Sequence, residues 1–402
     1  MQLLLADTLD PATVTALEGL GHQVRSEPAL TADTLPGALG GVDVLVVRST
    51  KVPSEAIDAA NRLQLIIRAG AGTNTIDVQA AADNGVYVAN VPGRNAVAVA
   101  ELTLGLLLAI DRRIFENVAD LRAGQWNKKA YSQADGLLGK TIGVVGLGSI
   151  GLAVAERATA FGLKVVSVRR PGRESNTEQR IRSLGIRLVD TIEELVETAD
   201  IVSLHVPAAP ETRGLFGADL LGRMKPGAIL LNTARGELID ADALCDAIDE
   251  RGLRVGLDVY PDEPSGGSAE WTSELACHPS VVGTHHIGAS TDQAQAAIAA
   301  GVVEIVDAYG RGEILNCVNL VERPLGACTL HVRHYDRVGV LASVLSELRG
   351  HELNVKQMEN RVFDGSNAAV AIIHVAGQVD DELLDIISNL DNVIHATRVG
   401  GN

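Results

Sequence analysis

The chain has 402 residues, of which 46% are apolar and only 3% aromatic, and its formal net charge is −17. A chain of this length can form two or three domains with sizeable cores, while so negative a charge argues against nucleic acid or an anionic membrane surface as a partner. The four cysteines have neither metal-ligand spacing nor the pattern of a disulfide framework, so we expect no metal site.

The chain begins with an apolar stretch at residues 2–6, without a charged leader segment before it, and no apolar run of 18 residues follows. These features predict a soluble cytoplasmic protein.

Up to residue 95, short apolar strands alternate with helices. The expected strands are residues 2–6, 42–47, 65–68 and 86–89, and the expected helices are residues 11–20, 57–61 and 76–84. This alternation predicts an α/β domain with a doubly wound, Rossmann-like sheet. An alanine-rich helix at 290–311 is long enough to return to this sheet, so the first domain should comprise residues 1–95 together with 290–315.

A second Rossmann-like domain is expected at residues 96–289, beginning with an apolar helix at 96–109. Its centre is a β-branched stretch that runs directly into G-x-G-x-x-G, formed by Gly146, Gly148 and Gly151. The first glycine allows a tight turn, the second lets backbone approach a pyrophosphate, and the third lets helix pack on strand. The start of the helix offers unpaired N–H groups to phosphates. A second strand at 164–168 completes a βαβ unit, so we predict a dinucleotide-binding site.

Three ionisable residues, Arg235, Glu263 and His286, each follow a later strand of this domain. They should lie at the edge of the sheet where ligands of open α/β folds bind. An arginine there can hold a carboxylate with two parallel hydrogen bonds, and a histidine paired with a carboxylate can donate a proton near neutral pH. A carboxylate anchor, a proton donor and a nicotinamide are what hydride transfer to a 2-keto acid requires.

The last block, residues 327–402, follows a linker expected at 316–326. Its apolar patterns predict the order strand, helix, strand, strand, helix, strand, which is that of a βαββαβ sandwich.

Six stretches of the chain resemble signatures of the D-2-hydroxyacid dehydrogenase family, and more closely those of its D-3-phosphoglycerate dehydrogenase branch. They are RAGAGTNTID, VAELTLGLLLA, GKTIGVVGLGSIG, LLNTARGELID, GLDVYPDEP and HHIGAST, in the family's order. The resemblance implies that Arg235, Glu263 and His286 are catalytic. It also implies that backbone near Ala71 and Gly72 meets the substrate carboxylate. The likeness also implies further residues of the dinucleotide site besides the three glycines of the turn. These are Ser149, Ile150, Val206, Thr233, Ala234, Asp258, Gly288 and Ala289, and Asp258 is expected to contact the nicotinamide carboxamide.

A phosphorylated substrate requires cations near the site. By resemblance, Arg48 and Lys128 are the expected phosphate contacts, and Lys51 is a weaker candidate. The alternative is that these are ordinary exposed cations.

The end of the second dinucleotide strand departs from the pattern of the NAD-using members. They carry an aspartate there that binds the ribose 2′-hydroxyl, whereas this chain has Arg169 and Arg170. Arginine at this position accommodates a 2′-phosphate, so the sequence favours NADP(H) over NAD(H).

The C-terminal block is similar to the ACT regulatory domain of phosphoglycerate dehydrogenases. His334, Asp336 and Asn354 fall where serine-sensing members place their ligand contacts, so L-serine is the expected effector. A module that only joins copies of the chain is the alternative. We expect a homodimer or homotetramer.

Three functions stay open from the sequence. The leading one is oxidation of 3-phosphoglycerate to 3-phosphohydroxypyruvate in L-serine biosynthesis. The second is a hydroxypyruvate or glyoxylate reductase with a regulatory tail. The third is a corepressor-like protein that senses dinucleotides, against which the complete set of Arg235, Glu263 and His286 speaks.

Overall fold

The computed structural model describes residues 1–264, 268–321, 326–365 and 367–399. The chain divides into two units, Met1–Asn319 and Leu320–Asn402. None of the described helices is both long and apolar enough to cross a membrane.

The first unit begins with a five-stranded parallel sheet in the order β2-β1-β3-β4-β5. Its strands are β1 (Gln2–Leu5), β2 (Gln23–Ser26), β3 (Val44–Val47), β4 (Leu65–Arg68) and β5 (Tyr87–Asn90), and the helices between them are α1 (Pro11–Gly19), α2 (Leu35–Ala38), α3 (Ser54–Asp58) and α4 (Val78–Asp83). Sequence patterns missed β2, which has no buried residue, and α2, which is a single turn.

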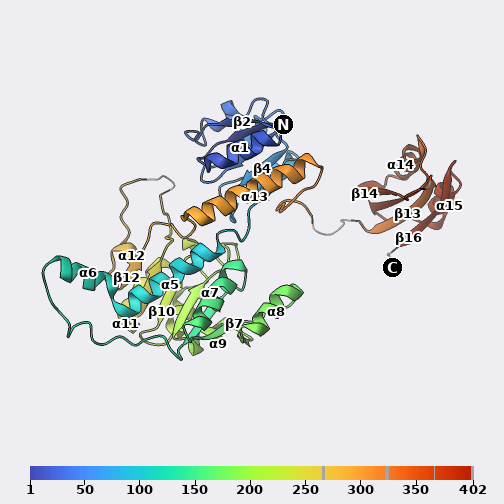
Figure 1. Cartoon of the computed structure of the whole chain (residues 1–402). Coiled ribbons are helices and arrows are strands. Elements are labelled where there is room, and N and C mark those ends of the chain that lie inside the picture. Colours follow the sequence, from blue (N-terminus) through green and yellow to red (C-terminus); the bar gives the residue numbers. More distant parts are fainter. Residues whose placement is uncertain (265–267, 322–325, 366, 400–402) are drawn as a thin grey trace. The chain divides into compact units, whose positions relative to one another are not determined.

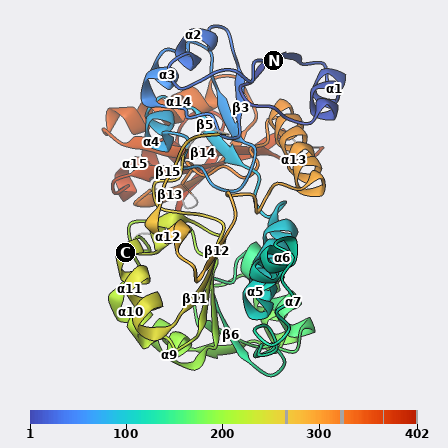
Figure 2. The same cartoon turned by 90° about the vertical axis from the view of Figure 1, so that its left-hand side faces the viewer.

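Two long helices connect this sheet with the next one (Figures 1 and 2). One is α5 (Ala96–Arg112), and the other, α13 (Asp292–Gly310), brings the chain back. On α13 an apolar stripe that includes Ile298, Val302 and Ile305 packs into the same core as Leu3 and Leu5 of β1. The returning helix therefore completes the core of the first sheet.

The second sheet has seven parallel strands in the order β12-β11-β10-β9-β6-β7-β8. The strands are β6 (Thr141–Val145), β7 (Lys164–Val168), β8 (Arg187–Val189), β9 (Ile201–Leu204), β10 (Ile229–Asn232), β11 (Arg254–Leu257) and β12 (Val281–Gly283). The helices are α7 (Ser149–Ala160), α8 (Ser175–Ser183), α9 (Ile192–Thr198), α10 (Ala218–Arg223), α11 (Ala241–Arg251) and α12 (Glu274–Cys277). One core lies under α5 and α7 and another under α9, α10 and α11, so both faces are covered.

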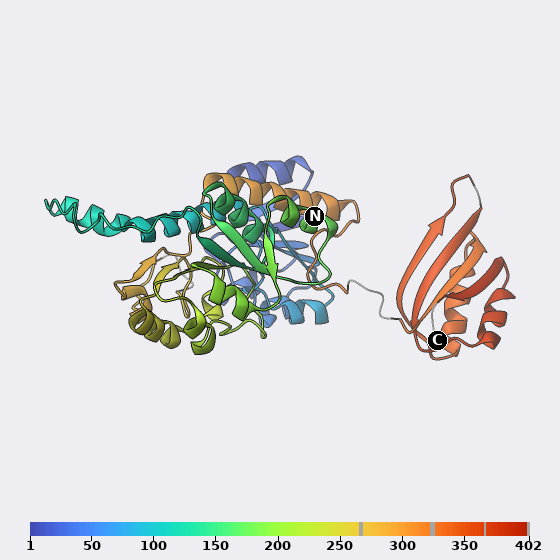
Figure 3. The same ribbon diagram turned by 90° about the horizontal axis from the view of Figure 1, so that it is seen from below.

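A projecting arm begins directly after α5, where Arg113 takes a left-handed backbone conformation with φ 48°. The arm consists of α6 (Ile114–Arg122) and the return segment up to residue 134, and Figure 3 shows it standing out from the sheets of the first unit. No residue of α6 is buried, which is why apolar patterning did not predict this helix.

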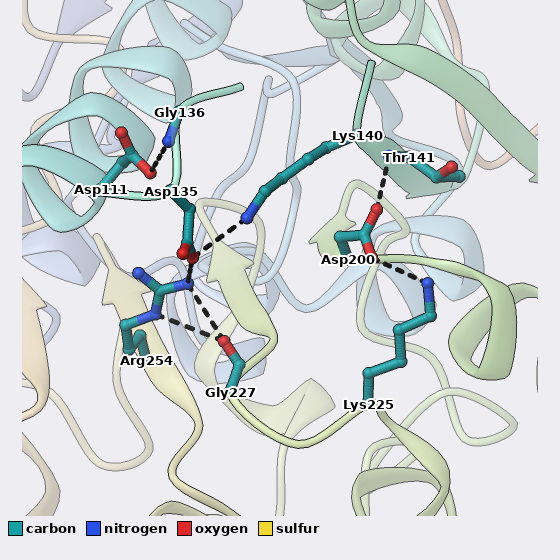
Figure 4. Close-up of polar contacts among 9 residues, drawn as sticks. All are labelled: Asp111, Asp135, Gly136, Lys140, Thr141, Asp200, Lys225, Gly227 and Arg254. Carbon is teal, nitrogen blue, oxygen red and sulfur yellow. Dashed lines mark hydrogen bonds and ion pairs between the residues drawn. The ribbon is translucent and has the colours of Figure 1, made fainter. Parts of the chain in front are cut away.

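The return segment is fixed at the amino ends of the second sheet by a charged network (Figure 4). The carboxylate of Asp135 lies 3.0 Å from both Lys140 Nζ and Arg254 Nη2. Beside it, Asp200 accepts hydrogen bonds from Thr141 N and Lys225 Nζ, each at 2.8 Å. Ligands of open α/β sheets bind at the opposite, carboxyl edge, so we attribute a structural role to this network.

The second unit has a four-stranded antiparallel sheet in the order β14-β15-β13-β16. Its elements are β13 (Cys328–Tyr335), α14 (Val340–Gly350), β14 (Asn354–Val362), β15 (Ala368–Ala376), α15 (Asp381–Ser388) and β16 (Val393–Val399). This is the expected βαββαβ order, with one core formed by the helices and the alternate residues of β13 and β15.

The expected linker at 316–326 differs from the structure in its first part. Asn316 O accepts a hydrogen bond from Asn90 N, and Val318 N donates to Val88 O, so this segment pairs with β5. The pairing covers what would be the open edge of the first sheet. Residues 322–325, with Pro324, lie outside the described residues.

Candidate active site

The glycine-rich turn between β6 and α7 has the geometry that a phosphate-binding loop requires. Gly146 has φ 100°, and a Cβ there would lie 2.6 Å from His205 O, while a Cβ on Gly151 would lie 1.9 Å from Gly146 O. A Cβ on Gly148 would meet open space, and this residue precedes α7 without a capping side chain. The first amides of α7 are therefore available to a pyrophosphate. Ser149 and Ile150 are the first two residues of this helix.

The turn after β10 holds Arg235 in place. The buried Asn232 accepts a hydrogen bond from Ala234 N at 3.0 Å and donates one to Arg235 O at 2.8 Å. Arg235 Nη1 donates to Ala234 O at 2.6 Å. A Cβ on Gly236 would lie 2.1 Å from the Tyr260 carbonyl carbon, so only glycine lets this turn pack against the loop after β11.

The guanidinium of Arg235 faces the loop that follows β4 of the first sheet. A Cβ on Gly72 would lie 2.2 Å from Arg235 Nη2, so the absence of a side chain at Gly72 makes room for this group. Ala71 O accepts a hydrogen bond from Asn90 Nδ2 at 2.6 Å. The two sheets thus bring together the residues expected to meet a substrate carboxylate.

His286 and Glu263 form a directly hydrogen-bonded pair between His286 Nδ1 and Glu263 Oε1. Glu263 Oε2 also accepts a hydrogen bond from Tyr260 N at 3.3 Å. Burial raises the pKa of Glu263, but the hydrogen bonds from His286 and Tyr260 N and the charges of His286 and Arg235 together outweigh it, and the net pKa is lowered. The glutamate therefore carries its negative charge at neutral pH. The side chain of His286 is 49% exposed and can reach a bound molecule.

Asp258 fixes the loop that carries this histidine. Its buried carboxylate accepts hydrogen bonds from Thr284 Oγ1 at 2.6 Å and from the amides of Ile287 and Gly288, both at 2.8 Å. His286 N donates to Asp258 O at 2.7 Å, and His286 has φ 51°. A left-handed backbone is uncommon for histidine and persists only where the surroundings enforce it. Contact of Asp258 with a nicotinamide remains a prediction.

Other residues expected at the dinucleotide site follow the same edge. Thr233 is buried, and its hydroxyl lies 2.8 Å from that of Thr103 on α5. Val206 comes after β9 and packs against the core below α9, and Ala289 O accepts a hydrogen bond from Gln295 Nε2 at 2.7 Å.

A cationic group that our sequence analysis missed lies at the carboxyl ends of β3 and β4. The Nε atom of Arg68 is buried without a hydrogen-bond partner. Burial, together with the nearby charges of Arg235 and Arg48, lowers the pKa of Arg68 to about 10, while the charge of Asp7 opposes them. Asp7 Oδ2 also accepts hydrogen bonds from the amides of residues 48–50 at 2.6–3.1 Å. The guanidinium of Arg68 is thus close enough to those of Arg235 and Arg48 for their charges to repel it.

Lys128 is not brought to these arginines within one chain. It lies on the projecting arm and lines a shallow pocket with Asp120, Trp126 and Tyr131. Trp126 is 82% exposed. Lys51, in contrast, follows β3 and is exposed.

The expected effector residues are not brought together in one copy of the second unit. His334 is buried, and its ring nitrogens are hydrogen-bonded to Tyr335 O and to Asn360 Oδ1 at 2.8 and 3.0 Å. It pairs with Ala369 of β15, whereas Asn354 pairs with Ala376 at the other end of that strand. Seven residues of strand separate these positions by about 23 Å. Asp336 is exposed.

The comparisons with known proteins agree with this arrangement. Residues 104–288 match the family described as D-isomer specific 2-hydroxyacid dehydrogenase, NAD binding domain. The D-3-phosphoglycerate dehydrogenase of Methanocaldococcus jannaschii is 36% identical over 394 residues, which cover 96% of this chain and 70% of that protein. The D-3-phosphoglycerate dehydrogenase of Mycobacterium bovis is 41% identical over 352 residues, but the chain spans only 64% of its length.

A shorter relative matches over nearly its whole length. The hydroxypyruvate reductase of Thermotoga maritima is 41% identical over 300 residues, which cover 74% of this chain and 94% of that protein. Among solved structures, the acyclic imino acid reductase Bsp5 in complex with NADPH and D-Arg superposes with a TM-score of 0.70 at 27% identity, covering 79% of this chain and all of that one.

Proposed function

The chain belongs to the D-isomer specific 2-hydroxyacid dehydrogenase family, and from this premise we propose that it oxidises 3-phosphoglycerate to 3-phosphohydroxypyruvate in L-serine biosynthesis. The observation that carries the proposal is the group of three arginines, Arg48, Arg68 and Arg235. One guanidinium is enough for the carboxylate of a simple hydroxy acid. A second anionic group such as a phosphate accounts for the other two.

In the proposed reaction each side chain has a separate task. Arg235 binds the substrate carboxylate together with the backbone at Ala71 and Gly72. His286 takes the hydroxyl proton during oxidation and returns it during reduction, and Glu263 stabilises the resulting imidazolium. A dinucleotide, with its pyrophosphate held at the glycine-rich turn, would supply the hydride-transfer chemistry through its nicotinamide.

Arg48 and Arg68 would hold the phosphate. Arg68 suits this role, because its buried Nε has no hydrogen-bond acceptor and the nearby charges of Arg48 and Arg235 favour binding of an anion. Lys128 can add to this site only from a second copy of the chain, since the arm carries it away from the arginines of its own copy. This fits the expected homodimer or homotetramer.

We also propose that NADP(H) is preferred to NAD(H). Arg169 and Arg170 lie at the carboxyl end of β7, where a carboxylate would bind the ribose 2′-hydroxyl and repel a 2′-phosphate. For the second unit we propose an ACT-type regulatory role with L-serine as ligand. Because His334 and Asn354 lie at opposite ends of the sheet, one ligand could meet both only between two copies.

The phosphate proposal is tested by replacing Arg68 with glutamine and measuring kcat/KM for 3-phosphohydroxypyruvate and for hydroxypyruvate. A charge-assisted contact contributes about 1.5–3 kcal/mol. We therefore expect kcat/KM for the phosphorylated substrate to fall roughly tenfold or more, with a much smaller loss for hydroxypyruvate. Arg25→Gln, which removes an exposed arginine of β2, serves as the matched control. Equal losses on both substrates would favour a second candidate, hydroxypyruvate reductase, which the match to the Thermotoga maritima enzyme supports.

A further inference from the structure

A third arginine lies beyond the pair at the end of β7, and it is the least exposed of the three. Gly172 has φ 76°, which turns the chain back so that Arg173 Nη2 donates a hydrogen bond to Val168 O at 2.8 Å. Val168 is the last residue of β7. The side chain of Arg173 is only 11% exposed, so its guanidinium is held against the end of the strand.

The other edge of this guanidinium has no hydrogen-bond acceptor. Arg173 Nη1 is buried without a hydrogen-bond partner, and its ion pair with Glu178 is long, with 3.9 Å between Nη1 and Oε1. Burial lowers the pKa of Arg173, Glu178 raises it, and the charges of Arg170 and Arg169 lower it again. A buried donor without an acceptor costs free energy, and so does crowding of like charges. An anion at this place would relieve both.

The two arginines that the sequence pointed to, Arg169 and Arg170, are more exposed than Arg173 and less fixed in position for binding a phosphate. Arg169 is 60% exposed and forms an ion pair with Asp190, with 3.3 Å between Nε and Oδ1. Arg170 is exposed and forms no ion pair within the described part of the chain. An exposed side chain loses rotamer entropy when it binds, whereas Arg173 is already positioned.

We propose that Arg173 is the principal contact of the 2′-phosphate of NADP(H) and thereby determines cofactor specificity, with Arg170 and Arg169 in secondary roles. This inference rests on the proposed preference for NADP(H). A guanidinium with one edge fixed to Val168 O offers its free edge to phosphate oxygens in a geometry that lysine cannot reproduce. Glu178 is then a competitor for the same edge, because its carboxylate faces Nη1.

The test is calorimetry on the full chain with adenosine 2′,5′-bisphosphate and with adenosine 5′-monophosphate, so that binding is measured apart from catalysis. We expect the unmodified protein to prefer the bisphosphate. Arg173→Gln should weaken binding of the bisphosphate by roughly tenfold or more and leave binding of the monophosphate unchanged. Arg169→Gln should have a smaller effect on the bisphosphate. Arg180→Gln is the matched control, because Arg180 is an exposed arginine of α8 that pairs with Glu156. This variant should bind both nucleotides as the unmodified protein does.

The outcomes separate this inference from the cofactor proposal. If the unmodified protein does not distinguish the two nucleotides, the preference for NADP(H) is wrong. If it does, and Arg173→Gln binds the bisphosphate as well as the unmodified protein, the preference holds but Arg173 is not its cause. Should Arg173→Gln weaken both nucleotides because the loop is disturbed, Glu178→Gln decides. Tighter binding of the bisphosphate by that variant supports the inference, and unchanged binding overturns it.

Discussion

Removing the negative charge of Glu263 should slow the oxidation of the hydroxy acid. In the proposed reaction His286 takes the hydroxyl proton, and the carboxylate hydrogen-bonded to its Nδ1 stabilises the imidazolium that forms. Glu263 is ionised throughout the neutral range because its pKa is lowered. In Glu263→Gln the amide keeps the shape but not the charge, so kcat/KM for oxidation should fall.

The size of the loss follows from the exposure of the pair. Two unit charges 4 Å apart interact by about 4 kcal/mol at an effective dielectric constant of 20 and by about 1 kcal/mol in water. The side chains of His286 and Glu263 are 49% and 32% exposed, so solvent screens the pair strongly. We take roughly 1.5 kcal/mol, which corresponds to a fall of about tenfold in kcat/KM.

The assay is steady-state oxidation of 3-phosphoglycerate, with thermal unfolding of each variant measured alongside. Asp262→Asn is the matched control, because Asp262 is the exposed acid next to Glu263 and asparagine tolerates its φ of 55°. If Glu263→Gln folded normally and oxidised the substrate as fast as the unmodified enzyme, the carboxylate would not be acting through His286.

Gly236→Ala should lower kcat/KM by roughly two orders of magnitude with little change in dinucleotide affinity, because the added Cβ meets the Tyr260 carbonyl and displaces the turn that carries Arg235. Steady-state kinetics and a crystal structure of the variant would check this, and unchanged kinetics would contradict it. L-serine should bind the intact chain but not a chain ending at Val321, as measured by calorimetry; equal binding to both would place the serine site outside the second unit.

The sequence predicted those parts of the site that lie in short segments directly after strands. The glycine turn, Arg235, Glu263 and His286 belong to this class, because the carboxyl ends of parallel strands meet at one edge whatever the details of packing. Asp258 was expected as a cofactor contact, and its hydrogen bonds to the histidine loop became visible only with the backbone in place.

Other parts could not be predicted from local patterns. Arg68 ends an apolar strand and lies beside two further arginines only through tertiary structure. Arg173 differs from Arg169 and Arg170 through burial, which the sequence does not encode locally. The arm lacks an apolar stripe, since α6 buries nothing within its own chain. In the second unit, the distance between His334 and Asn354 depends on the strand order β14-β15-β13, which periodicity cannot supply.

The returning helix α13 also constrains how the protein is made. Leu3 and Leu5 share a core with Ile298 and Val302, so the ribosome must add about 300 residues before that core can close. At 5–20 residues per second this takes roughly 15 to 60 s. During that interval the second sheet can be completed, since its last strand ends at Gly283. The emerging first sheet meanwhile lacks α13 on the face that this helix shares with α1, so apolar side chains there stay uncovered until α13 has been made.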